Sequence, residues 1–247
     1  MNQETTRQGL YLADMTWQEV SDRLQQQAIA VLPVAAAAKA HGPHLPMQTD
    51  LLQVNWLLEQ LCQTENILVW PVLNYGYYPA FVNYSGSVSL AEHTFIETVR
   101  AIIESMLHAS AQHIAILNSG ISTITPLAAA IAGYESPSCN LINCYAGRHY
   151  QRAVQNVVEN HQGGHADEEE TSIMLALYPD KVKTDCIEAG MLADKQPGPF
   201  NIESAGQVNY APNGVYGDPR KASAEKGHAL VAAMLRDVVD AIRIPQP

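Results

Sequence analysis

The chain has 247 residues, a formal net charge of −11 and 47% hydrophobic residues, which indicates a folded globular protein rather than an intrinsically disordered one. Its Lys and Arg residues form no basic cluster, so we expect no nucleic-acid partner. No run of about 18 apolar residues predicts a membrane span, and the start of the chain lacks the apolar core of a signal peptide, so we expect a cytoplasmic protein with reduced cysteines.

Apolar residues recur along the chain with the spacing of helices and of short buried strands. In chain order, the predicted elements are helix 17–27, strand 29–34, helix 51–62, strand 67–70, helix 95–109, strand 113–117, helix 125–133, strand 141–145, helix 150–160, a helix that begins near Glu168, and helix 222–242. The Gly-, Tyr- and Ser-rich segment 74–89 and the Pro-, Gly- and Asn-rich segment 197–219 are predicted loops.

Strands that alternate with helices and are apolar throughout predict a mainly parallel sheet covered by helices on both faces. In such folds, ligands bind beyond the carboxyl ends of the strands. The residues that follow each predicted strand are therefore the first place to look for chemistry.

The first strand leads into the loop 39–46, which reads Lys-Ala-His-Gly-Pro-His-Leu-Pro, and Asp50 opens the next helix. Two imidazoles three residues apart, a Gly-Pro turn and a carboxylate suit Zn²⁺ or Mn²⁺. The prolines fix φ and so pre-order the loop. Asp50 has a second interpretation as a helix N-cap, because it directly precedes Leu51 and Leu52. Both interpretations stay open at this point.

A second cluster of acids lies in the segment 163–172, which reads Gly-Gly-His-Ala-Asp-Glu-Glu-Glu-Thr-Ser. Asp167 can cap a helix here, with Glu170 three residues on as in a capping box. Glu170 also heads the apolar stripe of this helix, where a buried carboxylate needs a metal, a cation or donors as its partner. The same spacing predicts that Asp167 and Glu169 project elsewhere, and it leaves His165 and Glu168 open.

Two further loops contain candidate binding residues. Asn118 and Ser119 follow the third strand, where small residues let backbone N–H groups reach a substrate oxygen. An ordinary strand-to-helix turn with Ser or Thr capping explains them somewhat better. The segment 75–86 is rich in Tyr, including Tyr78, and fits either a pocket wall or a subunit contact. The sequence contains neither a dinucleotide fingerprint nor a nucleophile elbow.

Taken together, these segments resemble the creatininase (creatinine amidohydrolase) family. The matching pieces, in family order, are residues 32–34, 41–46, 49–50, 86–90, 118, 164–172, 174–179 and 224–227. They extend over roughly residues 15 to 243.

The resemblance implies a three-layer α/β sandwich with a mainly parallel central sheet, here as one domain over 1–247, often assembled as a homohexamer. It also implies a one- or two-metal centre, with Zn²⁺ or Mn²⁺, that activates water to attack a small amide or cyclic C–N substrate. On the family pattern, His41 and Asp50 are metal ligands, and Asp50 can bridge two ions. His165 and Glu170 fall in the segment that supplies acid–base groups, and we predict that they are catalytic.

The sequence departs from the family pattern at several ligand positions. Lys39 and Ala40 stand where the family usually has a metal-binding Glu, and Gly120 lies where a metal-binding His usually follows the Asn. We predict Glu168 as a replacement metal ligand. The predicted substrate-binding residues are His44, Tyr78, Asn118 and Ser119.

Two hypotheses follow from these observations. The first is a metal-dependent hydrolase of a small amide or cyclic substrate. The second is a catalytically inactive homologue that acts as a binding or assembly protein.

Overall fold

Five parallel strands form the central sheet of this protein. The structure, a computed structural model, describes residues 8–134, 138–191 and 210–243. In these ranges the strands are β1 (Leu10–Tyr11), β2 (Ile29–Val34), β3 (Ile67–Val69), β4 (Ile114–Asn118) and β5 (Cys139–Asn143), in the spatial order β1-β3-β2-β4-β5. β2 therefore lies at the centre, paired with β3 on one side and β4 on the other.

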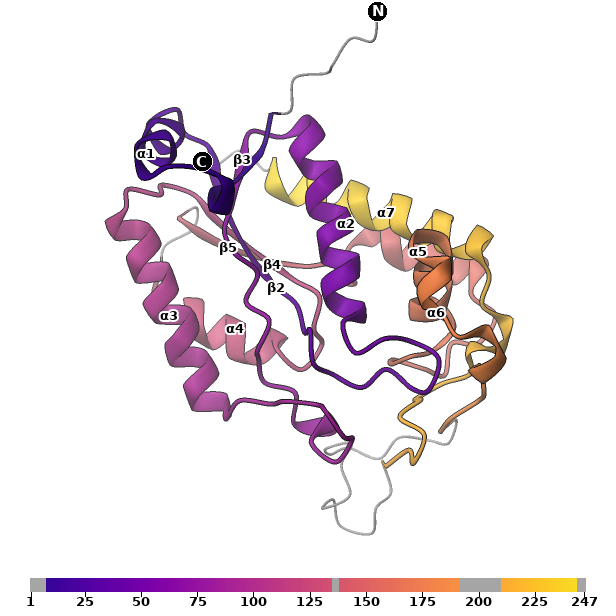
Figure 1. Ribbon diagram of the computed structural model, residues 1–247. Helices are drawn as coiled ribbons and strands as arrows, with labels where there is room; N and C mark the ends of the chain where they lie inside the picture. Colours follow the sequence, from indigo (N-terminus) through magenta and orange to yellow (C-terminus); the bar gives the residue numbers. More distant parts are fainter. Residues whose placement is uncertain (1–7, 135–137, 192–209, 244–247) are drawn as a thin grey trace, which may run out of the picture.

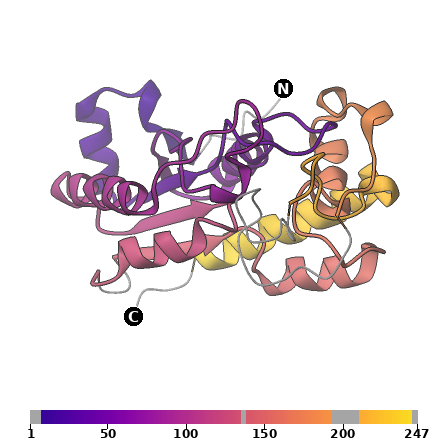
Figure 2. The ribbon, with the colours of Figure 1, turned by 90° about the horizontal axis from the view of Figure 1, so that it is seen from below.

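Helices cover both faces of the sheet (Figure 1). One layer consists of α1 (Trp17–Gln25), α3 (Glu92–His108) and α4 (Ile124–Ile131), and the other of α2 (Thr49–Thr64), α5 (Arg148–Val157), α6 (Glu168–Leu177) and α7 (Ala224–Ile242). Side chains alternate along β2, so that Leu32 packs with the first layer and Val31 with the second. α7 runs between α5 and α6 and contacts both (Figure 2).

This architecture confirms the predicted three-layer α/β sandwich. Every predicted helix and strand is present, and most bounds agree to within three residues. The predicted strand 141–145 begins two residues earlier, at Cys139, and also ends earlier, at Asn143. β1 was not predicted, because a strand of two residues has no periodicity to detect. Within the predicted loop 197–219, residues 197–209 lie outside the described ranges.

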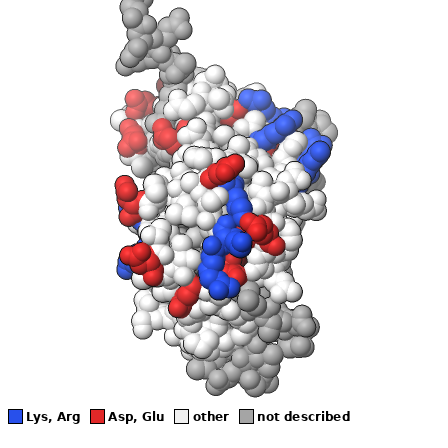
Figure 3. All heavy atoms as spheres, turned by 90° about the vertical axis from the view of Figure 1, so that its right-hand side faces the viewer, with Lys and Arg blue, Asp and Glu red and all other residues white. Residues whose placement is uncertain are grey.

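Charges of both signs are interspersed on the face that carries α5 to α7 (Figure 3). In the described ranges, Lys226 pairs with Glu159 and Glu168, and Arg220 pairs with Asp218. Interspersed charges of both signs are typical of a solvated protein face. Among the described helices, none has the length and apolar character needed to cross a membrane.

Candidate metal and substrate site

The loop that follows β2 carries His41 to the carboxyl end of the central strand, beside the start of α2. His41 and Asp50 are fully buried. Asp50 is the second residue of α2, and the N-cap position belongs to Gln48, so the side chain of Asp50 does not cap this helix. Instead Asp50 Oδ1 lies 3.0 Å from His41 Nε2, and Oδ2 lies 2.7 Å from the ammonium nitrogen of Lys39.

Asp50 is ionised despite its complete burial. Burial alone opposes the charged form, but the ammonium of Lys39 and the ring of His41 more than offset it, so the pKa of Asp50 lies well below its usual range. Lys39 is itself buried, and its ammonium lies 5.3 Å from the ring centre of Phe81 and 5.6 Å from that of Tyr78. The aromatic faces therefore give this buried cation further stabilisation.

The turn before α6 and the first turn of this helix bring His165 and Glu170 close to His41. Asp167 caps this helix by accepting hydrogen bonds from the backbone N–H groups of Glu169 and Glu170. Before it, Ala166 has a φ of 49°, a left-handed conformation that residues with a Cβ rarely adopt and that here reverses the chain after His165. The Ala166 N–H donates to Glu170 Oε2, which lies 3.5 Å from His165 Nδ1.

Two backbone carbonyls determine how the imidazoles are oriented. A carbonyl oxygen only accepts, so His41 Nδ1–H donates to Lys39 O at 2.8 Å, and His165 Nε2–H donates to Ala40 O at 2.7 Å. In the neutral rings, His41 Nε2 and His165 Nδ1 are then left with lone pairs. Burial holds the pKa of His165 well below its usual value, so this ring is neutral.

Each of these ring nitrogens faces a carboxylate oxygen, and a proton or a metal ion between the two atoms stabilises such a pair. The donor atoms of His41, His165 and Glu170 all lie within 4.8 Å of one another. Two imidazoles and a carboxylate suit Zn²⁺ or Mn²⁺, and metal-binding histidines usually donate their other ring N–H to a carbonyl or carboxylate. The residues present therefore fit one divalent cation.

A cavity of about 530 Å³ opens beside this cluster. Its wall includes Lys39, His165 and Glu170, together with residues 118–122 and Ile124 at the end of β4 and after it.

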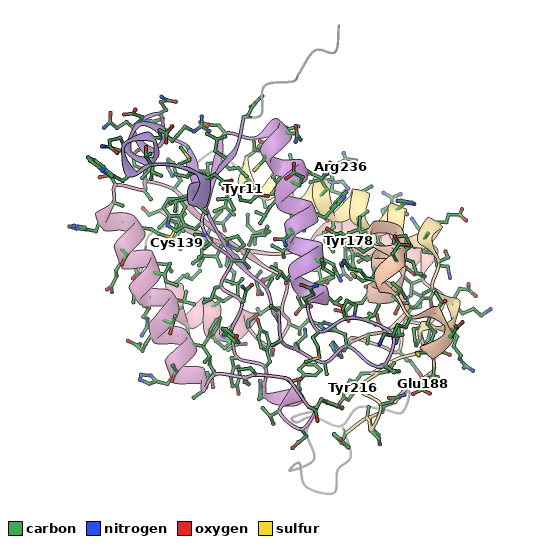
Figure 4. The ribbon with its side chains drawn as sticks, in the orientation of Figure 1. Tyr11, Cys139, Tyr178, Glu188, Tyr216 and Arg236 are labelled. Carbon is green, nitrogen blue, oxygen red and sulfur yellow. The ribbon has the colours of Figure 1, made fainter. Side chains whose placement is uncertain are left out.

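Tyr216 lies next to His165. The backbone N–H of Tyr216 donates to the His165 carbonyl, and the hydroxyl of Tyr216 lies 3.0 Å from the Tyr84 hydroxyl. Figure 4 shows Tyr216 on the side where the strands end, away from Cys139 at the start of β5. The cavity thus lies where a parallel sheet binds its ligands.

The other predicted residues have different surroundings. Asn118 and Ser119 both line the cavity, and hydrogen bonds of the Asn118 side chain to Gly120 and Thr123 shape the loop. Tyr78 is buried under Lys39, and its hydroxyl has no hydrogen-bond partner among the described residues. His44 turns away from the cavity wall and bonds to Thr171, and burial lowers its pKa to about 4.

The structure places the Glu168 carboxylate apart from the cluster. It is fully buried, accepts from the backbone N–H groups of Glu159 and Asn160 at 3.1 and 2.9 Å, and lies 2.6 Å from the ammonium nitrogen of Lys226. These donors compensate the buried charge. We therefore leave Glu168, which the sequence suggested as a metal ligand, out of the candidate ligand set.

Replacing Lys226 with Met is expected to lower the free energy of unfolding by about 1.5–3 kcal/mol, because the buried Glu168 loses a charged donor. Lys221→Met is the matched control. Lys221 is exposed and 3.6 Å from Glu159, so its loss should cost less than about 1 kcal/mol. Urea denaturation of both variants measures the difference, and equal losses would contradict the assigned role of Lys226.

The sequence analysis missed several residues of the cavity. Asp167 and Glu169 were predicted to project elsewhere, yet both line the cavity, and Glu169 accepts a hydrogen bond of 2.8 Å from the Tyr150 hydroxyl. Burial raises the pKa of Glu169 to about 7. Its place in a run of acids is the only signal in the sequence, whereas Tyr150 had none beyond its position in a predicted helix.

Comparisons with known proteins agree with this fold. The sequence model of the family described as "Creatininase: Creatinine amidohydrolase" matches residues 13–242. A 3-dehydro-scyllo-inosose hydrolase of Thermotoga maritima is 26% identical over 92% of this chain and 80% of its own length. A mycofactocin precursor peptide peptidase of Mycolicibacterium smegmatis is 28% identical over 92% of this chain and 90% of its own length.

Solved structures of creatininase share the fold. The manganese form superposes with a TM-score of 0.82 at 24% identity, over 95% of this chain and 98% of that one. A form described as the Zn–Zn type gives the same TM-score and identity, over 94% and 96% of the two chains. At this identity, the likeness establishes the three-layer architecture.

Proposed function

This chain belongs to the creatininase family, and from that premise we propose that it is a metal-dependent hydrolase that cleaves an amide or another C–N bond in a small substrate. The relatives support hydrolysis, because their names describe a 3-dehydro-scyllo-inosose hydrolase and a mycofactocin precursor peptide peptidase, and the second of these supports cleavage of an amide bond. Creatinine itself is a poor candidate, because Lys39, Ala40 and Gly120 occupy positions where the family usually has ligands.

One observation carries the proposal. His41 and His165 are each fixed by a backbone carbonyl so that the remaining ring nitrogen faces the other ligand atoms, and Glu170 completes the set. Such pre-organisation is what a metal site needs, because the ligands do not have to be reoriented when the ion binds. The set adjoins a cavity large enough for a small molecule.

We assign His41, His165 and Glu170 to holding the ion, with Asp50 next to them. A divalent cation bound there supplies Lewis acidity and lowers the pKa of water, which provides hydroxide near neutral pH. Hydrolysis then adds the oxygen of water to the carbonyl carbon, and the nitrogen leaves with a proton.

The cavity wall offers two groups that can orient an amide. Lys39 presents an ammonium that can donate to the carbonyl oxygen. Glu169, held by the Tyr150 hydroxyl, presents a carboxyl group that can accept from the amide N–H. The two therefore suit opposite ends of the bond to be cleaved.

The test is the metal content of the purified protein, measured by mass spectrometry, and its hydrolysis of small amides, cyclic amides and short peptides with added Zn²⁺ or Mn²⁺. We expect bound metal and hydrolysis of at least one substrate, with loss of both after chelation. Protein that binds no added metal and hydrolyses no member of the panel would favour a binding or assembly role instead.

The resemblance also predicts a homo-oligomer, often a hexamer, and the cysteines and the start of the sequence predict a cytoplasmic location. Both remain predictions for this chain.

A further inference from the structure

Lys39 has an unusual position for a lysine, because its charged end lies inside the protein and beside the proposed metal ligands. The residue is 5% exposed, and its ammonium nitrogen lies 2.7 Å from Asp50 Oδ2. Lys39 also lines the cavity. Burying an ammonium is costly unless it is paired. A buried lysine also does not contribute to solubility, so its position here points to a role in the site.

Asp50 directs its two carboxylate oxygens to different partners. Oδ1 lies 3.0 Å from His41 Nε2, on the side of the proposed ligand set, whereas Oδ2 meets Lys39. A carboxylate that bridges two ions uses one oxygen for each. In this protein the second oxygen is already occupied by a fixed positive charge.

The charge balance points the same way. Ligands bind a metal in their deprotonated form, so with an ion bound Asp50 and Glu170 contribute two negative charges, the two imidazoles contribute none, and Lys39 contributes one positive charge. One divalent cation brings the sum of these groups to one positive charge, which a hydroxide or an anionic substrate group neutralises. A second divalent cation would leave three positive charges in a buried site, which is strongly unfavourable at low dielectric.

We propose that the Lys39 ammonium takes the place of a second metal ion, so that the centre holds one divalent cation per chain with Lys39 as its second positive charge. This inference rests on the proposed function, since it concerns the same site. It assigns Lys39 two tasks: it neutralises Asp50 from the side away from His41, and it presents a positive charge to the cavity.

The experiment measures the number of ions bound per chain. Wild-type protein and three variants, Lys39→Glu, Lys39→Met and Lys39→Arg, are stripped of metal and titrated with Mn²⁺ or Zn²⁺ by calorimetry, and the bound metal is then measured by mass spectrometry after gel filtration. Circular dichroism and thermal unfolding of each variant establish that it is folded.

We expect one ion per chain for the wild type and for Lys39→Arg, which keeps the charge. Lys39→Glu should bind two, because a carboxylate next to Asp50 replaces the fixed cation with a ligand. Lys39→Met, which removes the charge at similar volume, should show a second and weaker ion. The Lys39→Met variant therefore still tests the proposal if Lys39→Glu does not fold.

Two ions in the wild type would overturn this inference and leave the proposed function standing. The inference is equally overturned if Lys39→Glu and Lys39→Met, once shown to be folded, each bind only one ion per chain. A wild-type protein that binds none would instead remove the proposed function, and the inference with it.

Discussion

Replacing Glu170 with Gln is expected to lower the affinity for Zn²⁺ or Mn²⁺ by about 100-fold or more and to abolish hydrolysis at ordinary metal concentrations. Losing a residue that only orients a ligand already costs ~10–100-fold in affinity, so the loss of a ligand should reach at least the upper end of that range. The amide oxygen of Gln can still accept the hydrogen bond from the Ala166 N–H, so the turn before α6 should persist. Calorimetric titration with metal measures the change.

Glu168→Gln is the control for this variant, because the two residues lie on the same helix and differ in the direction of their carboxylates. Glu168 bonds to Lys226 and to two backbone N–H groups, outside the ligand set. This variant should lose stability and keep its metal affinity within a few-fold. If Glu168→Gln loses the ion and Glu170→Gln retains it, the ligand set described above is wrong.

The second large effect concerns stability. Gly227→Ala is expected to lower the free energy of unfolding by about 3 kcal/mol or more, at the upper end of the cost of overpacking. A Cβ at Gly227 would lie 1.9 Å from the backbone oxygen of Ser172 and 2.7 Å from the Cβ of Ala176, so α6 and α7 would have to move apart. A backbone atom cannot rotate out of the way as a side chain does. The gain of about 1 kcal/mol in helix propensity is therefore outweighed.

His228→Ala is the matched control, since it changes the next residue of α7 at an exposed position. It should shift stability by less than about 0.5 kcal/mol. Because Glu170 lies in the first turn of α6, a displacement of α6 in Gly227→Ala should also weaken metal binding, which titration at low temperature can measure. A loss below about 1 kcal/mol in urea denaturation of Gly227→Ala would contradict the tight α6–α7 contact.

Part of the candidate site could be located from the sequence, because local sequence determines where these residues lie. His41 follows the central strand directly, and the rule that ligands bind beyond the carboxyl ends of parallel strands indicated its loop. The apolar stripe of α6 correctly placed Glu170 on the inner side of the helix, where it meets His165.

The remaining features depend on contacts between distant segments, which periodicity does not reveal. Glu168 faces Lys226, which is 58 positions later in the chain. Glu169 enters the cavity because α5 supplies Tyr150 as its partner. The pairing of Lys39 with Asp50 could not be read from the sequence either, since a lysine at a ligand position indicates only that a ligand is missing, not what has replaced it.

The carbonyls that orient the two histidines belong to consecutive residues, Lys39 and Ala40. Main-chain oxygens persist when side chains change, so the orientation of both imidazole rings does not depend on which side chains occupy these two positions. The charge at position 39 can therefore be changed while His41 and His165 keep their orientation. One backbone scaffold can in this way serve centres of different metal number and different substrate charge, which makes positions 39 and 40 the first choice for redesigning specificity in this protein.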